Sequence, residues 1–177
     1  MSTPTLLGIC GSLRAGSFNR KLMNVAAAVH GGPFTEGSIR LPLYDGDLED
    51  AEGVPESVRE LAGQIEAADG VLICSPEYNQ SIPGGLKNAL DWVSRLKENP
   101  WKDKPVALMH AAAGRAGGAR CNYALRLAMA PFRPVVVHGP EVLVASAFKE
   151  FAEDGSLSNE MYMNAIAETM DLLKGAS

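Results

Sequence analysis

The sequence predicts an α/β fold in which helices cover both faces of a parallel, doubly wound sheet. Short apolar segments alternate along the chain with longer segments of helical periodicity. Most of these apolar segments contain almost no polar residue, as is typical of strands that are buried on both faces. Polar or glycine-rich loops follow three of them, and in such a sheet the ligand site lies beyond the carboxyl ends of the strands.

Five strands are expected, and the pattern near the end of the chain also allows a short extra strand. The expected strands cover residues 5–10, 38–43, 70–74, 105–110 and 134–137, with the extra one at 142–144. Segment 38–43 carries the weakest strand pattern of the five.

Helices are expected where apolar side chains recur every three or four positions. They cover residues 18–29, 55–68, 83–96, 118–130 and 158–174. Pro83 suits a first helical turn, where no hydrogen bond of its backbone nitrogen is lost. Ser158 is the expected N-cap of the last helix. The acidic segment 45–53 is expected to be a solvated loop.

Composition limits the classes of function. The chain has 177 residues, 46% of them apolar, which predicts a single domain over residues 1–177. A net charge of -5 and a pI near 5.2 argue against a nucleic-acid-binding protein. Runs of about 18 apolar residues are absent from the sequence, so we expect no transmembrane helix. The N-terminus does not resemble a signal peptide.

Cysteine and histidine usage indicates neither disulfides nor a metal site. Cys10, Cys74 and Cys121 are scattered and odd in number, which favours buried thiols in a reducing cytoplasm. The three histidines, which are far apart in the sequence, are expected on the surface or at helix ends rather than as metal ligands: His30, His110 and His138.

The loop after the first strand has the composition of a phosphate-binding loop. Ser12, Ser17 and Asn19 offer hydrogen-bond donors, and Arg14 offers a charged one. The helix that follows adds free N–H groups and a partial positive charge at its N-terminus. These groups suit a phosphate monoester. The simpler interpretation is an ordinary helix cap, with Ser17 as N-cap and Arg14 solvated.

Other phosphate motifs fit this loop poorly. Gly11 and Gly16 have the spacing of a Walker A loop, but Ser17 stands where that motif needs lysine. The glycine pattern of a dinucleotide fingerprint is absent from the sequence. A tyrosine phosphatase loop needs five residues between its cysteine and arginine, whereas three separate Cys10 from Arg14.

The loops after two further strands suit a flat ring. Pro76, Glu77, Tyr78 and Asn79 lie between an apolar strand and a helix that begins near Pro83. Backbone N–H groups there would stabilise negative charge on a reduced flavin. The glycine-rich segment 111–120 would let a ring approach the backbone closely. The simpler interpretation is that Tyr78 packs and Glu77 is solvated.

At these residues the chain resembles the NADPH-dependent FMN reductases, which are flavodoxin-like, and in particular their chromate and quinone reductase branch. The resemblance lies in residues 11–20 (GSLRAGSFNR), 75–88 (SPEYNQSIPGGLKN) and 117–121 (GGARC). It extends to residue 155 and so spans nearly the whole chain. It implies a five-stranded parallel sheet with the strand order 2-1-3-4-5.

The resemblance also implies the roles of individual residues. FMN would be contacted by the following residues: Ser12, Arg14, Ser17, Phe18, Asn19, Pro76, Glu77, Tyr78, Asn79, Ser81, Gly114, Gly117 and Gly118. Arg120, Tyr123 and Glu141 would make polar contacts between subunits of a homodimer or homotetramer, or else form a solvated face. Two departures from the family pattern are Gln80, where glycine is common, and the alanines at 111–113, where hydroxyl residues are common.

The expected function is that of an FMN-dependent oxidoreductase with no catalytic side chain and no metal. The resemblance implies that NADPH or NADH reduces FMN, which then reduces a quinone, an azo dye, a chromate-type oxyanion or free flavin in a ping-pong cycle. Two alternatives stay open. One is a flavodoxin-like electron carrier without NAD(P)H reductase activity, and the other is a phosphate-ester binder or hydrolase that uses only the first loop.

Overall fold

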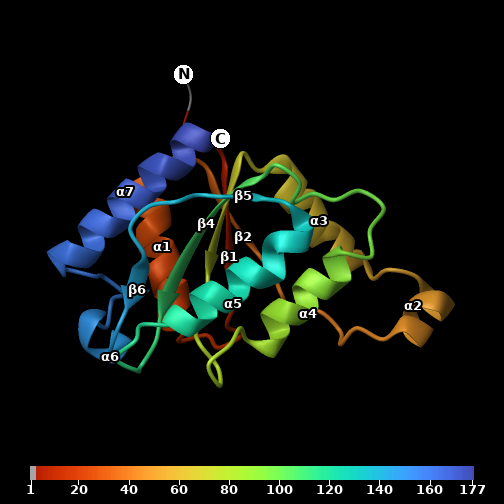
Figure 1. Ribbon diagram of the computed structural model, residues 1–177, viewed down its shortest axis with the longest axis horizontal. Coiled ribbons are helices and arrows are strands. Elements are labelled where there is room, and N and C mark those ends of the chain that lie inside the picture. Colours follow the sequence, from red (N-terminus) through yellow and green to blue (C-terminus); the bar gives the residue numbers. More distant parts are fainter. Residues whose placement is uncertain (1–2) are drawn as a thin grey trace.

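The computed structural model describes residues 3–177 as a parallel sheet between two layers of helices (Figure 1). The strands are β1 (Leu6–Cys10), β2 (Phe34–Gly37), β3 (Gly70–Cys74), β4 (Pro105–Ala111), β5 (Val135–Val136) and β6 (Val142–Val144). Their order is β2-β1-β3-β4-β5, and β6 also pairs with β4. The predicted order is therefore confirmed, and the short extra strand expected at 142–144 is present as β6. The extra strand lies along the same edge of β4 as β5: β5 pairs with the start of β4, and β6 pairs with its end.

Alternate residues of each strand pack on opposite helix layers. The helices are α1 (Phe18–His30), α2 (Gly46–Glu52), α3 (Glu56–Ala67), α4 (Gly84–Val93), α5 (Ala119–Met129), α6 (Ala147–Glu150) and α7 (Glu160–Ala176), with a 3₁₀ turn, η1 (Ala130–Phe132). Leu7 and Ile9 share a buried cluster with residues of α3, α4 and α5. Leu6 and Cys10 share one with residues of α1 and α7. None of the helices in residues 3–177 is long and apolar enough to cross a membrane.

The prediction for the second strand was wrong. The strand is β2 at Phe34–Gly37, and residues 38–43 have no regular structure. β2 lies at the edge of the sheet, so Thr35 and Glu36 are exposed and the apolar pattern of a buried strand is missing. A Cβ at Gly37 would lie 2.9 Å from the Leu61 side chain, so the end of this strand packs directly on α3.

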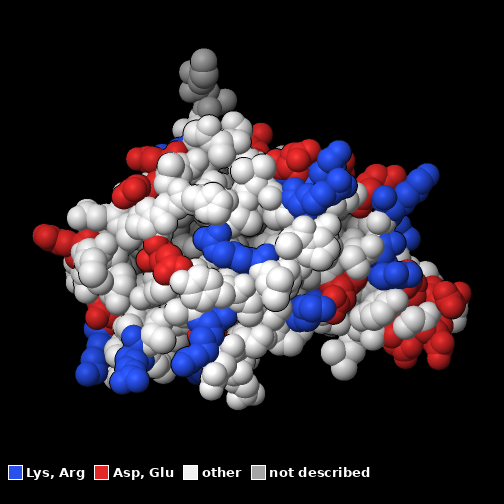
Figure 2. Space-filling model, in the orientation of Figure 1, with Lys and Arg blue, Asp and Glu red and all other residues white. Residues whose placement is uncertain are grey.

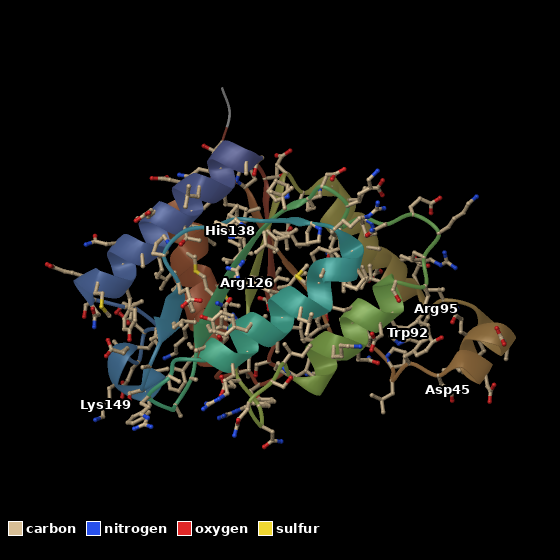
Figure 3. All side chains as sticks on the ribbon, viewed as in Figure 1. Asp45, Trp92, Arg95, Arg126, His138 and Lys149 are labelled. Atoms are coloured by element: carbon tan, nitrogen blue, oxygen red, sulfur yellow. The ribbon has the colours of Figure 1, made fainter. Side chains whose placement is uncertain are left out.

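The acidic segment is a short helix rather than the expected loop. Asp45 caps α2 by accepting the N–H of Asp47 at 2.9 Å, and α2 buries none of its residues. Glu49 ties it to the body of the protein, because its carboxylate lies 2.8 Å from Nε of Arg95. Tyr44 packs edge-on against Trp92. α2 therefore projects from the body as an acidic lobe (Figures 2 and 3).

Other helix boundaries differ by a few residues. The last helix begins at Glu160 with Asn159 as its N-cap, not Ser158. Pro83 is itself the N-cap of α4 and lies outside its first turn, and α4 ends at Val93 instead of residue 96.

The register of the sheet brings three loops together. Cys10 of β1 lies opposite Cys74 of β3, which lies opposite Met109 of β4. The three strands are parallel and end at nearly the same level, so the segments that follow them meet at one edge of the sheet. The predicted site residues lie in these segments.

Candidate functional site

The three loops line two adjoining hollows at this edge. The first, of about 210 Å³, is lined by residues of all three loops: Ser12, Arg14, Gly16, Ser17, Phe18, Asn19, Pro76, Glu77, Tyr78 and Ala111 to Ala113. The second, of about 420 Å³, is lined by Glu77 and by the third loop, including Gly114, Gly117 and Gly118. Glu77, Ala112 and Ala113 line both hollows, which therefore form one continuous surface.

The first loop presents several unused donors to the first hollow. Ser17 is the N-cap of α1, and its Oγ accepts the N–H of Asn19 at 3.2 Å. Within residues 3–177, the backbone N–H groups of Gly16, Ser17 and Phe18 have no protein acceptor. The guanidinium of Arg14 is exposed and pairs with no carboxylate of the described chain. A helix N-terminus, free N–H groups and a free arginine fit a phosphate group.

Asn19 has a structural contact that the sequence did not indicate. Its side chain is buried, and Nδ2 donates to the carbonyl of Ala111 at 2.8 Å while Oδ1 accepts the N–H of Ala111 at 2.9 Å. The amide thus joins the start of α1 to the end of β4. Its expected contact with phosphate stays a prediction. Its neighbour Phe18 stacks on Phe151, with ring centroids 5.9 Å apart.

Glu77 joins the second loop to the third. Its Oε2 accepts the N–H groups of Arg120 at 3.0 Å and Cys121 at 3.2 Å, in the first turn of α5. Nη1 of Arg120 lies 3.7 Å from the other carboxylate oxygen. Gly118, the N-cap residue, has no side chain to cap this helix, so Glu77 supplies the cap from a distant loop. The simpler expectation of a solvated Glu77 was wrong.

The second loop turns back on itself directly after Tyr78. Tyr78 and Ser81 exchange two backbone hydrogen bonds of 3.0 Å each, and the residues between them, Asn79 and Gln80, have φ of 49° and 64°. This is a two-residue turn in which both central residues are left-handed, a conformation that favours glycine and asparagine. Tyr78 lines the first hollow, whereas Asn79 and Ser81 line neither of the two hollows. Their contact with a ring stays a prediction.

Two glycines of the third loop are required by the backbone. Gly117 has a φ of 60°, and a Cβ there would lie 2.4 Å from the carbonyl oxygen of Leu143. Gly118 has a φ of 97°, and a Cβ there would lie 2.7 Å from Cβ of His110. Gly114 lines the same hollow without a comparable contact. The glycines therefore let this loop lie close to β4 and β6.

His110 is a buried strand residue, which corrects the expectation of a surface or helix-end position. Its Nδ1 lies 2.9 Å from the carbonyl oxygen of Ser75, directly before the second loop. Burial lowers the pKa of His110 to about 4, so the imidazole is neutral at pH 7 and Nδ1–H donates to Ser75. His30 ends α1 and His138 is exposed, as expected.

The thiols are buried and protonated. Burial raises the pKa of Cys10 and of Cys74, and it raises the pKa of Cys121 to about 11. Cys10 therefore lacks the thiolate that a phosphatase loop needs. Among residues 3–177, no group of three or more potential metal ligands is placed to hold an ion.

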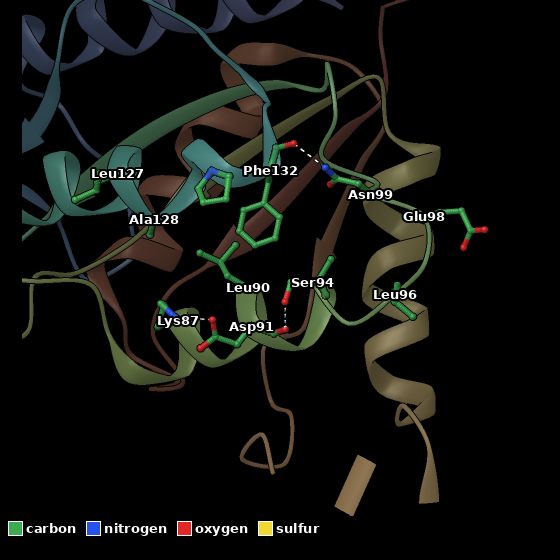
Figure 4. Close-up of a pocket in the computed structure, with 12 residues that line it drawn as sticks. Lys87, Leu90, Asp91, Ser94, Leu96, Glu98, Asn99, Leu127, Ala128 and Phe132 are labelled. Carbon is green, nitrogen blue, oxygen red and sulfur yellow. Dashed lines mark hydrogen bonds and ion pairs between the residues drawn. The ribbon is translucent and has the colours of Figure 1, made fainter. Parts of the chain in front are cut away.

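Of the expected subunit-contact residues, Arg120 and Tyr123 lie on α5, and Glu141 lies directly before β6. Arg120 is exposed and Tyr123 is 60% exposed. Oε1 of Glu141 accepts a hydrogen bond of 2.8 Å from Nδ2 of Asn122. Leu127, also on α5, borders a larger hollow of about 510 Å³ between α4 and α5 (Figure 4). That hollow contains none of the predicted cofactor residues.

Comparison with known proteins supports the family resemblance that the three loops indicated. A family model described as NADPH-dependent FMN reductase matches residues 4–149. A quinone reductase of Escherichia coli K12 is 45% identical over 139 residues, which cover 76% of this chain and 74% of that protein. An NAD(P)H-dependent FMN reductase of Pseudomonas aeruginosa is 38% identical over 172 residues, which cover 96% of this chain and 92% of that protein.

A solved structure shares the fold over almost the full length. The flavoenzyme NAD(P)H:(acceptor) oxidoreductase FerB of Paracoccus denitrificans superimposes with a TM-score of 0.86 at 35% identity, over 97% of this chain and 96% of that one. These matches confirm the family resemblance inferred from the loop motifs.

Proposed function

Because the chain belongs to the NADPH-dependent FMN reductase family, we propose that its three loops hold FMN and that its acceptor is a quinone or another small oxidant. The observation that carries this proposal is the continuity of the two hollows, one lined by phosphate-type donors and the other by glycines of the third loop. Such a surface suits a ligand with a phosphate at one end and a flat ring at the other.

The residues present fit the phosphate of FMN. Arg14, Ser12 and Ser17 would hold it together with the free N–H groups at the start of α1, whose positive end faces the same hollow. The ring would lie beside Pro76, Glu77 and Tyr78, and against the backbone of the third loop. FMN, when bound, accepts hydride from NAD(P)H and passes the electrons to the second substrate.

The protein's own contribution is position and electrostatics. Asn19 and Glu77 tie the three loops together, through the backbone of Ala111 and the first turn of α5. The glycines leave room for a ring beside the backbone. None of the side chains is required as an acid or base in this proposal, because the cofactor supplies the chemistry.

The relatives favour a reductase over a simple electron carrier. Several are named for quinone reduction, and FerB is named as an NAD(P)H:(acceptor) oxidoreductase. Quinones are therefore the first acceptors to test, followed by azo dyes, chromate-type oxyanions and free flavin. The protonated, unpaired thiols are consistent with the cytoplasm as its location.

We also propose a homodimer or homotetramer that uses the outer face of α5. Arg120, Tyr123 and Glu141 would contribute to it, and Leu127, which is 77% exposed, adds apolar surface to the same helix. Light scattering on the wild type and on Tyr123→Glu tests this. The variant should dissociate to a smaller species, and an unchanged mass would exclude this face.

The deciding experiment for the function is the visible spectrum of the purified protein with FMN, before and after anaerobic addition of NADPH or NADH. Flavin bands that bleach within seconds are expected of a reductase. Bound flavin that stays oxidised would instead indicate an electron carrier, and failure to bind flavin would favour the phosphate-ester binder.

A further inference from the structure

A separate polar hollow lies at the carboxyl ends of β1 and β2. It measures about 350 Å³ and is lined by the ends of β1 and β2, the first loop, α1 and the segment after β2, including Leu13, Arg20, Glu36, Ser38 and Arg40. We call it the arginine hollow. It shares Ser12 with the first hollow of the proposed FMN site and no other lining residue. A molecule bound at the FMN site therefore has the arginine hollow as its direct neighbour.

The charge of this hollow favours an anion. Nε of Arg20 lies 2.8 Å from Glu36, and its Nη1 donates to the carbonyl of Arg14 at 3.1 Å, so the guanidinium is held in place from two sides. Arg40 is exposed, and none of the ion pairs within residues 3–177 involves it. Two arginines against one glutamate leave one positive charge beside the hydroxyls of Ser12 and Ser38. Arginine and hydroxyl donors together are typical phosphate ligands.

The same hollow has an apolar wall. It is formed by Leu13, which is 46% exposed, and by the buried Ile39, both of which line the hollow. Exposed apolar surface next to guanidinium groups suits the base and sugar of a nucleotide better than a free inorganic anion. A volume of about 350 Å³ is in the range of small-molecule sites.

We propose that the arginine hollow receives the adenosine 2′-phosphate end of NADPH, with Arg40 as the residue that distinguishes NADPH from NADH. This inference rests on the proposed function, because it assigns a site to the hydride donor of that reaction. The FMN phosphate has its own donors in the neighbouring hollow, at Arg14 and the N-terminus of α1. Arg20 already forms an ion pair with Glu36 and is part of the wall of the hollow. Arg40 forms no ion pair within residues 3–177, so its charge can pair with the ligand.

The first test compares initial rates with NADPH and NADH for the wild type and Arg40→Gln, both saturated with FMN. We expect KM for NADPH to rise about 10- to 100-fold, as for the loss of one charge-assisted contact, and KM for NADH to stay within about twofold. Arg59→Gln is the matched control, because Arg59 is an exposed arginine on α3 that does not line the hollow. An unchanged KM for NADPH, an equal rise for both donors, or the same rise in Arg59→Gln would overturn the proposal.

The second test does not depend on turnover. Calorimetric titration of the FMN-loaded protein with 2′,5′-ADP should show binding that Arg40→Gln weakens at least tenfold, while 5′-AMP binds both proteins weakly. Equal binding of 2′,5′-ADP by both proteins would overturn the assignment. Wild-type protein that binds 2′,5′-ADP but is not reduced by NADPH would contradict the proposed function and leave the hollow's ligand class supported. The two proposals can therefore fail separately.

Discussion

Asn19 offers a direct test of how the first and third loops are held together. Replacing it with alanine removes both partners of the Ala111 backbone, whose N–H and C=O lie 2.9 and 2.8 Å from the Asn19 amide in a buried position. A buried polar group left unpaired costs about 1–3 kcal/mol. Two such groups predict that the free energy of unfolding falls by about 2–6 kcal/mol. This is a large share of the roughly 5–15 kcal/mol that stabilises a typical domain.

Urea denaturation of the FMN-free protein measures this loss directly. Asn24→Ala is the control, because Asn24 is an exposed residue of the same helix and its replacement should change the unfolding free energy by less than about 0.5 kcal/mol. If Asn19 serves only as a phosphate ligand, Asn19→Ala would weaken FMN binding and leave the FMN-free protein as stable as the control variant. That result would refute the role of Asn19 as a brace between α1 and β4.

Three further predictions address other parts of the site. Arg14→Ala should weaken FMN binding about 10- to 100-fold and riboflavin binding hardly at all, because riboflavin lacks the phosphate. Fluorescence titration with both ligands measures this, and equal losses of affinity would contradict the phosphate assignment. Gln80→Gly should raise the unfolding free energy by about 0.5–1 kcal/mol, since Gln80 has a φ of 64° that glycine adopts without strain; a lower melting temperature would contradict this. The lowered pKa of His110, about 4 in the folded chain against 6.5 ordinarily, means that the unfolded chain binds a proton first as the pH falls. Stability should therefore decline between about pH 6.5 and 4, by roughly 3 kcal/mol from this group, and His110→Gln should flatten that decline in denaturation curves measured across the range; an unchanged slope would contradict it.

The elements that sequence patterns located best are those with strong local signals. β1, β3 and β4 are buried on both faces, so uninterrupted apolar runs marked them within a residue or two. The N-cap role of Ser17, which the simpler interpretation of the first loop named, is present, and it was visible in the sequence because capping depends on residues next to one another. β2 and α2 were missed because both are largely exposed and follow no buried pattern.

The candidate site divides in the same way. Its residues could be predicted from the sequence, because Arg14, the hydroxyl residues and the glycines stand in short segments after strands. The family motifs lie in those same segments. The contacts that hold the site together could not be predicted from the sequence. Glu77 reaches α5 from 43 residues away, and Asn19 reaches Ala111 from 92 residues away. Sequence spacing carries no signal for such pairs.

The sequence by itself determined the alternation of strands and helices, the three loops and the chemistry that they offer to a phosphate and a flat ring. These follow from periodicity and residue type within short windows of the chain. Only the tertiary structure decided that His110 is buried under the second loop, that Glu77 caps α5, and that Arg20 and Arg40 border a hollow beside the first loop. The reason is that long crossovers separate neighbouring parallel strands in the sequence. Which distant side chains meet depends on how these strands pair, and that pairing exists only in the folded sheet.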